Sequence, residues 1–136
     1  MSLSFAGFAD TLDYWSVYLN DSLIGHYNTL STDNEMTLSI SVINENDTIN
    51  IIYGNDHPCT KCEYYYAARE MKNRVKVQAV RKKKILTKVS FSLNQLKTRM
   101  IKYQEVPIDF EFFLHEDNYI SEIDPYTILF KLKITK

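Results

Sequence analysis

The densest group of chemically reactive residues in this chain is His57, Cys59 and Cys62. Two cysteines three positions apart can close a small disulfide ring, act as a redox dithiol or supply half of a zinc site. A redox dithiol usually begins a helix within a βαβ unit, whereas the residues on both sides of this pair favour strands. Zinc needs about four ligands, and His26 and His115 are the only other histidines. The pattern therefore favours a disulfide that staples the loop, and leaves a metal site, a redox site or two reduced thiols as alternatives.

Charge is divided into blocks along the chain. Residues 1–60 contain eight acids and no Lys or Arg, residues 61–104 contain thirteen bases and two acids, and residues 105–136 contain three bases and seven acids. The simplest expectation for one compact domain is that basic strands lie beside acidic strands and the charges cancel. The alternative gathers the bases on one open face, as a site for phosphate, nucleic acid or anionic polysaccharide. The candidate residues for such a polyanion site are Arg74, Lys76, Arg81, Lys82, Lys83, Lys84 and Lys88.

The remaining polar and aromatic residues do not form a catalytic set. No serine or cysteine nucleophile neighbours His26 or His115 in the sequence, so both are expected to be structural or exposed imidazoles. Residues 64–66 are three consecutive tyrosines, and because side chains alternate along a strand, at least one must lie on an outer face or a rim. Tyrosine at such a position suits sugar or protein recognition. The sequence therefore leans toward a protein that is not an enzyme and that needs no cofactor.

These residues have to be positioned mainly by strands, because apolar and polar residues alternate in several segments. The clearest alternation covers residues 36–42. Asp109 and Glu111 lie on the polar face of one later segment, and Lys131 and Lys133 on that of the next, so these two segments suit adjacent antiparallel strands. Strands are expected at residues 15–19, 23–28, 36–42, 49–53, 63–69, 74–80, 85–91, 108–114 and 126–134.

One short helix is expected over residues 93–100. Ser92 and Gln95 fit a capping box, in which the Ser hydroxyl accepts from the third helical amide and the Gln side chain returns to the Ser amide. Nine short strands with one short helix and no βαβ alternation predict an all-β fold, a two-sheet antiparallel sandwich that spans residues 1–136 as a single domain. A closed β-barrel is the alternative, since both architectures share the same periodicity. No apolar run approaches the ~18 residues that a membrane-spanning helix requires.

The apolar faces of these strands supply the predicted core. Its expected members are Trp15, Leu38, Ile40, Val89, Phe110, Phe112, Ile128 and Phe130.

Four segments of the first half carry a resemblance. They are residues 15–20 (W-S-V-Y-L-N), 23–25 (L-I-G), 46–53 (N-D-T-I-N-I-I-Y) and 56–62 (D-H-P-C-T-K-C). Together they resemble small secreted or lipid-anchored β-domains of Gram-negative gut bacteria, a family that brings no assigned activity. The resemblance implies an exported domain, periplasmic, cell-surface or secreted, whose signal peptide is absent from this sequence or has been removed. Such a location agrees with a disulfide between Cys59 and Cys62.

The function that these observations favour is that of an extracytoplasmic, non-enzymatic β-domain that binds a partner or scaffolds a surface assembly. The expected partner is a protein or a carbohydrate. Nucleic acid is disfavoured by the formal net charge of −1. The alternative is a thiol-redox or metal-binding protein that uses Cys59 and Cys62.

Overall fold

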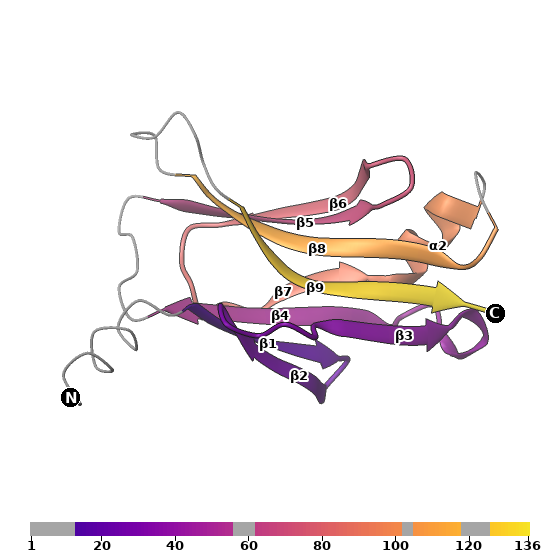
Figure 1. The fold of residues 1–136 in the computed structure, drawn as a ribbon, viewed down its shortest axis with the longest axis horizontal. Helices are drawn as coiled ribbons and strands as arrows, with labels where there is room; N and C mark the ends of the chain where they lie inside the picture. Colours follow the sequence, from indigo (N-terminus) through magenta and orange to yellow (C-terminus); the bar gives the residue numbers. More distant parts are fainter. Residues whose placement is uncertain (1–12, 56–61, 102–104, 118–125) are drawn as a thin grey trace.

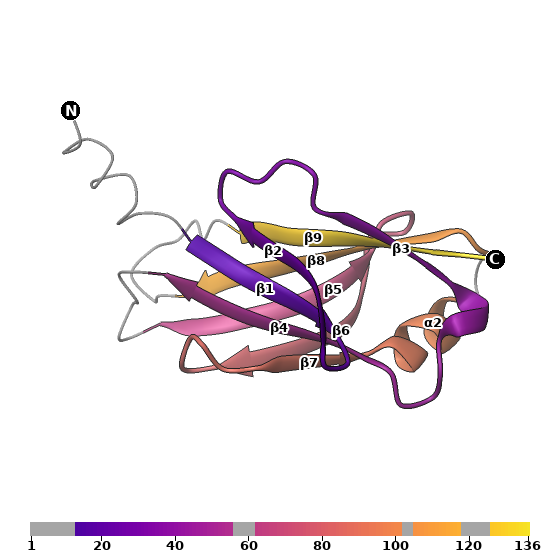
Figure 2. The ribbon, with the colours of Figure 1, turned by 90° about the horizontal axis from the view of Figure 1, so that it is seen from below.

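The computed structural model describes residues 13–55, 62–101, 105–117 and 126–136. In this part of the chain two stacked β-sheets enclose the core, and one short helix lies at an end of the stack (Figures 1 and 2). The strands are β1 (Asp13–Leu19), β2 (Ser22–Asn28), β3 (Glu35–Ser39), β4 (Thr48–Asn55), β5 (Glu63–Glu70), β6 (Val75–Lys82), β7 (Val89–Ser92), β8 (Ile108–Asp117) and β9 (Tyr126–Thr135). A 3₁₀ turn, η1 (Ile40–Val42), follows β3, and helix α2 (Leu93–Ile101) follows β7.

The strand order confirms the predicted sandwich. One sheet has the order β2-β1-β4-β7 and the other β3-β9-β8-β5-β6, and within the described residues neither closes into a barrel. Hairpins join β1 with β2 and β5 with β6. The pair β3 and β9 is parallel, which departs from a purely antiparallel sandwich. The chain reaches β3 by crossing from the other sheet, so no hairpin dictates its direction.

The hydrophobic core between the sheets is rich in aromatic rings. Phe112 of β8 stacks on Phe130 of β9 with ring centroids 4.4 Å apart, and it meets Phe91 of β7 edge-on at 5.1 Å. The second contact joins the two sheets. Leu38 and Ile40 are half-buried at the border of this core. Five predicted core residues are buried: Trp15, Val89, Phe110, Phe112 and Phe130.

The prediction for Ile128 is wrong, because its side chain is 42% exposed on the outer face of the five-stranded sheet. Phe112 lies opposite Phe130, but Phe113 lies opposite Ile128. Leu129 is therefore an additional residue in β9, a β-bulge. Because a one-residue slip moves side chains to the other face, Leu129 takes the core position that the alternation assigned to Ile128.

The strand predicted over residues 36–42 ends early. Its last three residues, Ile40–Val42, form η1 instead. The Ser39 hydroxyl accepts a hydrogen bond from the Ser41 amide at 3.4 Å, which gives the backbone a local alternative to the sheet ladder. Val42 is consequently 59% exposed.

Helix α2 begins where the capping pattern predicts. The Ser92 hydroxyl accepts from the Gln95 amide at 3.2 Å, as in a capping box. The Ser92 amide, however, is bonded by a side chain of another strand and not by Gln95. Gln78 of β6 accepts from the Ser92 amide at 3.0 Å and donates to the Ser92 carbonyl at 2.7 Å. Gln78 thereby ties β6, the last strand of one sheet, to β7, the last strand of the other. Among the described residues, α2 included, no helix combines the length and apolar character needed to cross a membrane.

Candidate functional site

One lateral edge of the sandwich carries a concentration of positive charge. Residues 71–101, which run from the turn before β6 to the end of α2, contain ten Lys or Arg and no Asp or Glu. We define the basic edge by the seven bases that the sequence singled out: Arg74, Lys76, Arg81, Lys82, Lys83, Lys84 and Lys88. Lys82 is half-buried and the other six are exposed. The fold therefore places all seven on β6 and on the connections that precede and follow it.

The turn that begins the basic edge is fixed by a buried carboxylate. Glu70 is 0% exposed, and it accepts hydrogen bonds from the amide of Lys72 and, at 3.0 Å, from the amide of Asn73. Arg74 then enters β6 with a positive φ of 55°. From Arg74 to Arg81 the strand rises by about 23 Å, at ~3.3 Å per residue. The basic edge is thus long enough to follow an extended polymer.

Two bases of this edge fold back onto the outer face of β5. Tyr65 accepts a hydrogen bond from the Lys76 ammonium at 3.0 Å, and the Lys76 and Arg81 cations lie 4.9 and 4.8 Å from its ring centroid. Arg81 also forms an ion pair with Glu63 at 3.4 Å. Tyr65 is the outward-facing member of the tyrosine run, since Tyr64 and Tyr66 are buried.

The other five bases have no such neutralisation. Within the described residues, Arg74, Lys82, Lys83, Lys84 and Lys88 form no ion pair. In the part of the chain that the structure describes, strand β6 has β5 on one side and no strand on the other. The neighbour of β7, strand β4, contains no charged residue. The expected cancellation by adjacent acidic strands therefore acts on one side of β6 alone, and polyanion binding stays a prediction.

The cysteine motif lies at the start of β5. Cys62 is buried in the core at 4% exposure, whereas His57 and Cys59 fall outside the described residues. The pairing of Cys59 with Cys62 stays a prediction. No group of three or more His, Cys, Asp or Glu side chains that could hold a metal ion occurs in the described parts of the chain. His115 lies on the outer face of the five-stranded sheet, opposite Tyr65 and Tyr126 on the two neighbouring strands.

The structure brings together one Ser–His pair that sequence reasoning missed. The Ser16 hydroxyl lies 2.8 Å from Nδ1 of His26, on the exposed face of the first hairpin. A regular two-residue hairpin would place Gly25 opposite Ser16, but a bulge at Ile24 shifts His26 into that position. No described Asp or Glu is hydrogen-bonded to His26, so the pair lacks the carboxylate of a catalytic triad.

Two carboxylates and two tyrosines form a polar network at the end of the sandwich where β1 begins. The Tyr53 hydroxyl donates to Asp13 at 2.5 Å, and the rings of Tyr53 and Tyr64 lie 6.2 Å apart. Burial, followed by the hydrogen bond to Asp13, raises the pKa of the Tyr53 hydroxyl. Burial also raises the pKa of Glu116, and the negative charge of Asp13 adds to this, while a hydrogen bond with Tyr64 opposes it.

Replacement of Glu116 by Gln is expected to stabilise the protein at neutral pH. Because the pKa of Glu116 is raised on folding, the ionised carboxylate destabilises the folded state, and this cost disappears as the pH falls below the unfolded pKa of about 4.3. The melting temperature of Glu116→Gln should exceed that of the wild type at about pH 7 and approach it at about pH 4. Thermal unfolding over this pH range measures the difference, with Glu45→Gln as an exposed control. A variant less stable than the wild type at neutral pH contradicts the assignment.

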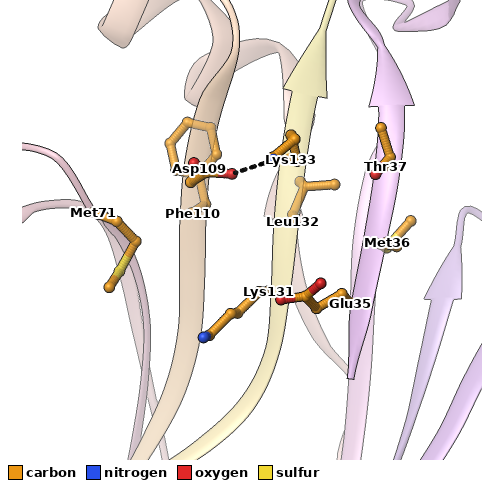
Figure 3. Close-up of a pocket in the computed structure, with 9 residues that line it drawn as sticks. All are labelled: Glu35, Met36, Thr37, Met71, Asp109, Phe110, Lys131, Leu132 and Lys133. Carbon is orange, nitrogen blue, oxygen red and sulfur yellow. Dashed lines mark ion pairs between the residues drawn. The ribbon is translucent and has the colours of Figure 1, made fainter. Parts of the chain in front are cut away.

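A groove of about 340 Å³ lies on the outer face of the five-stranded sheet (Figure 3). It crosses β8, β9 and β3 and ends against the turn that follows β5. The opposite charges of β8 and β9 were predicted to lie side by side, and Asp109 does pair with Lys133 at 3.9 Å. The contributions of β3 and of Met71 could not be predicted, because they depend on the crossover of β3 and on the turn. The lining includes the apolar side chain of Met71 and five polar side chains: Glu35, Thr37, Asp109, Lys131 and Lys133.

Fold and surface together define a two-sheet β-sandwich with a basic edge and a charged groove on one outer face. Comparison of the chain with protein-family models, with curated proteins and with solved structures finds no match in any of the three.

Proposed function

We propose that this chain is an extracytoplasmic binding module that captures an anionic polysaccharide along its basic edge. The observation that carries the proposal is the charge of residues 71–101, which contain ten bases and no acid. Their strands, β6 and β7, each end a sheet, and no described acidic strand lies outside them. Cations in a row along an extended edge bind a polyanion by releasing its counterions, so the net charge of the whole chain matters less than the local one.

The chemistry of the edge favours a polysaccharide over a nucleic acid. Proteins that bind single-stranded nucleic acid without sequence preference add aromatic rings on which bases stack. The tyrosine beside the basic edge, Tyr65, is already covered by Lys76 and Arg81. Five of the seven bases are lysines, which act as compact point charges toward carboxylate and sulfate groups.

The extracytoplasmic location is part of the proposal and rests on two supports. One is the resemblance to small secreted or lipid-anchored β-domains of Gram-negative gut bacteria. The other is the cysteine pair, which suits an oxidising compartment. A redox role for Cys59 and Cys62 has less support, because a strand rather than a helix follows Cys62 and its side chain is buried. A thiol titration with metal analysis of untagged protein tests this alternative.

The proposal predicts that the wild type is retained on heparin at low salt. Lys82→Ala, Lys83→Ala and Lys84→Ala combined should elute earlier and lower the slope of log affinity against log salt by about 2–3, since each lost contact removes about 0.7–0.9. The matched control is the combination Ser22→Glu, Leu30→Glu and Thr32→Glu, which makes the same change in net charge at exposed positions on β2 and the loop after it. This control should elute close to the wild type.

Three outcomes decide against the proposal. Flow-through of the wild type at low salt ends it. Equal shifts of the lysine variant and the control mean that net charge acts rather than the basic edge. Tighter binding to single-stranded DNA than to heparin at equal salt overturns the polysaccharide assignment.

A further inference from the structure

The groove of Figure 3 ends at Met71, in the turn that leads to the basic edge. Met71 forms its wall, and the Met71 amide donates to the Asp109 carbonyl at 2.9 Å, which holds the turn against β8. The same turn continues through Lys72 to Arg74, the first base of the edge. A polymer that follows the basic edge beyond Arg74 therefore reaches the groove.

Lys131 and Lys133 both line this groove, and of the two only Lys133 has an ion pair among the described residues. The neighbours of Lys131 across the strands are Glu111 on β8 and Glu35 on β3. Glu111 is already neutralised, since it accepts from Arg69 at 2.6 Å and is 4% exposed. Within the described residues Lys131 forms no ion pair, and Figure 3 shows its ammonium extending across the groove toward β8.

The remaining polar groups of the groove are hydrogen-bond acceptors. Asp109 forms its ion pair with Lys133 at a long 3.9 Å, and both side chains are about half exposed, so the pair contributes little and leaves carboxylate oxygens open. Glu35 lines the opposite side, and its carboxylate has no described hydrogen bond. The Met71 side chain adds an apolar surface. One cation without an ion pair, two acceptors and an apolar wall match a sugar ring that bears a carboxylate, several hydroxyls and an apolar C–H face.

We infer that the groove is a subsite for one uronic acid residue of the bound polysaccharide. Its carboxylate accepts from Lys131, its hydroxyls donate to Asp109 and Glu35, and its ring lies against Met71. The volume of about 340 Å³ is at the lower end for small-ligand sites, which suits a single sugar residue. This inference rests on the proposed function and names the sugar that the polymer contains.

The test compares alginate, a polymer of uronic acids, with dextran sulfate, which contains none. Lys131→Ala should weaken alginate binding about tenfold, as the loss of a charge-assisted hydrogen bond does. Its effect on dextran sulfate should match that of the control Lys136→Ala, which removes the same charge outside the groove. Thermal unfolding checks that each variant is folded.

Asp109→Asn is the more decisive variant, because the subsite and a purely electrostatic effect predict opposite changes in alginate affinity. Removal of a negative charge would strengthen binding to any polyanion by a general electrostatic effect. In a subsite, however, the neutral amide oxygen of asparagine is a weaker acceptor for a sugar hydroxyl than the carboxylate, so alginate binding should weaken severalfold while dextran sulfate binds slightly more tightly.

The two proposals fail in different ways. If dextran sulfate depends on Lys82, Lys83 and Lys84, but Asp109→Asn leaves alginate binding unchanged or stronger, the uronate subsite is wrong and the basic edge stands. If the wild type binds neither polymer, both proposals are wrong.

Discussion

Phe112→Ala is expected to lower the free energy of unfolding by about 3–5 kcal/mol. The Phe112 ring is fully buried, stacks on Phe130 within its own sheet and meets Phe91 of the opposite sheet edge-on. Its loss removes both contacts and leaves a cavity that the two stiff sheets can fill only partly. Chemical denaturation followed by circular dichroism measures the change.

The matched control for this prediction is Tyr126→Ala. Tyr126 is also aromatic and on the same sheet, but its side chain is 51% exposed on the outer face. Tyr126→Ala should lower the free energy of unfolding by well under half as much as Phe112→Ala does. A loss below about 1 kcal/mol for Phe112→Ala would contradict its central place in the core.

Trp15→Phe is expected to cost about 2–4 kcal/mol, through lost core volume and one lost hydrogen bond. The Trp15 indole N–H donates to the carbonyl of Leu129 at 2.9 Å, and this buried bond joins the two sheets at the bulge of β9. The Leu129 carbonyl also accepts from the Asn34 side chain at 3.1 Å. Phenylalanine leaves the carbonyl with that second partner alone.

A double-mutant cycle tests whether the two donors share one acceptor. Asn34→Ala alone should cost about 1 kcal/mol, because Trp15 continues to satisfy the Leu129 carbonyl. The double variant should lose more than the sum of the two single losses, since the buried carbonyl then has neither donor. Strict additivity would show that the bulge carbonyl finds another partner.

Local patterns predicted the strands well because alternation and turn residues are local properties. Residues 108–114 and 126–134 fall within β8 and β9, and their opposite charges meet as Asp109 and Lys133. The helix start at Ser92 followed from a capping pattern four residues long. None of these features depends on distant parts of the chain.

Bulges escaped prediction, and they decide which side chains share a face. The extra residue Leu129 reversed the expected burial of Ile128, and the extra residue Ile24 placed His26 beside Ser16. The bulge in β9 places the Leu129 carbonyl where Trp15 of the other sheet donates to it. Such a contact between distant segments is not visible in the residue pattern of one strand.

For the basic edge, too, one property could be predicted from the sequence and another could not. Composition identified the block of bases, but its effect depends on whether β6 is a central or an edge strand. Sheet order is a non-local property, so cancellation by acidic neighbours was the simplest expectation. The structure places β6 at the end of its sheet, which leaves five of the seven bases without an ion pair among the described residues.

The position of β9 between β3 and β8 has a consequence for how the chain folds as it is made. Bonds from the β9 residue Leu129 reach Asn34 and Trp15, which are 95 and 114 positions earlier. The five-stranded sheet therefore stays incomplete until β9 has left the ribosome, and until then β3 and β8 both expose unsatisfied strand edges. A chain dominated by such distant pairings folds slowly, roughly in milliseconds to seconds. Throughout its synthesis the chain therefore carries two strand edges on which another copy could pair, and release of β9 ends that exposure.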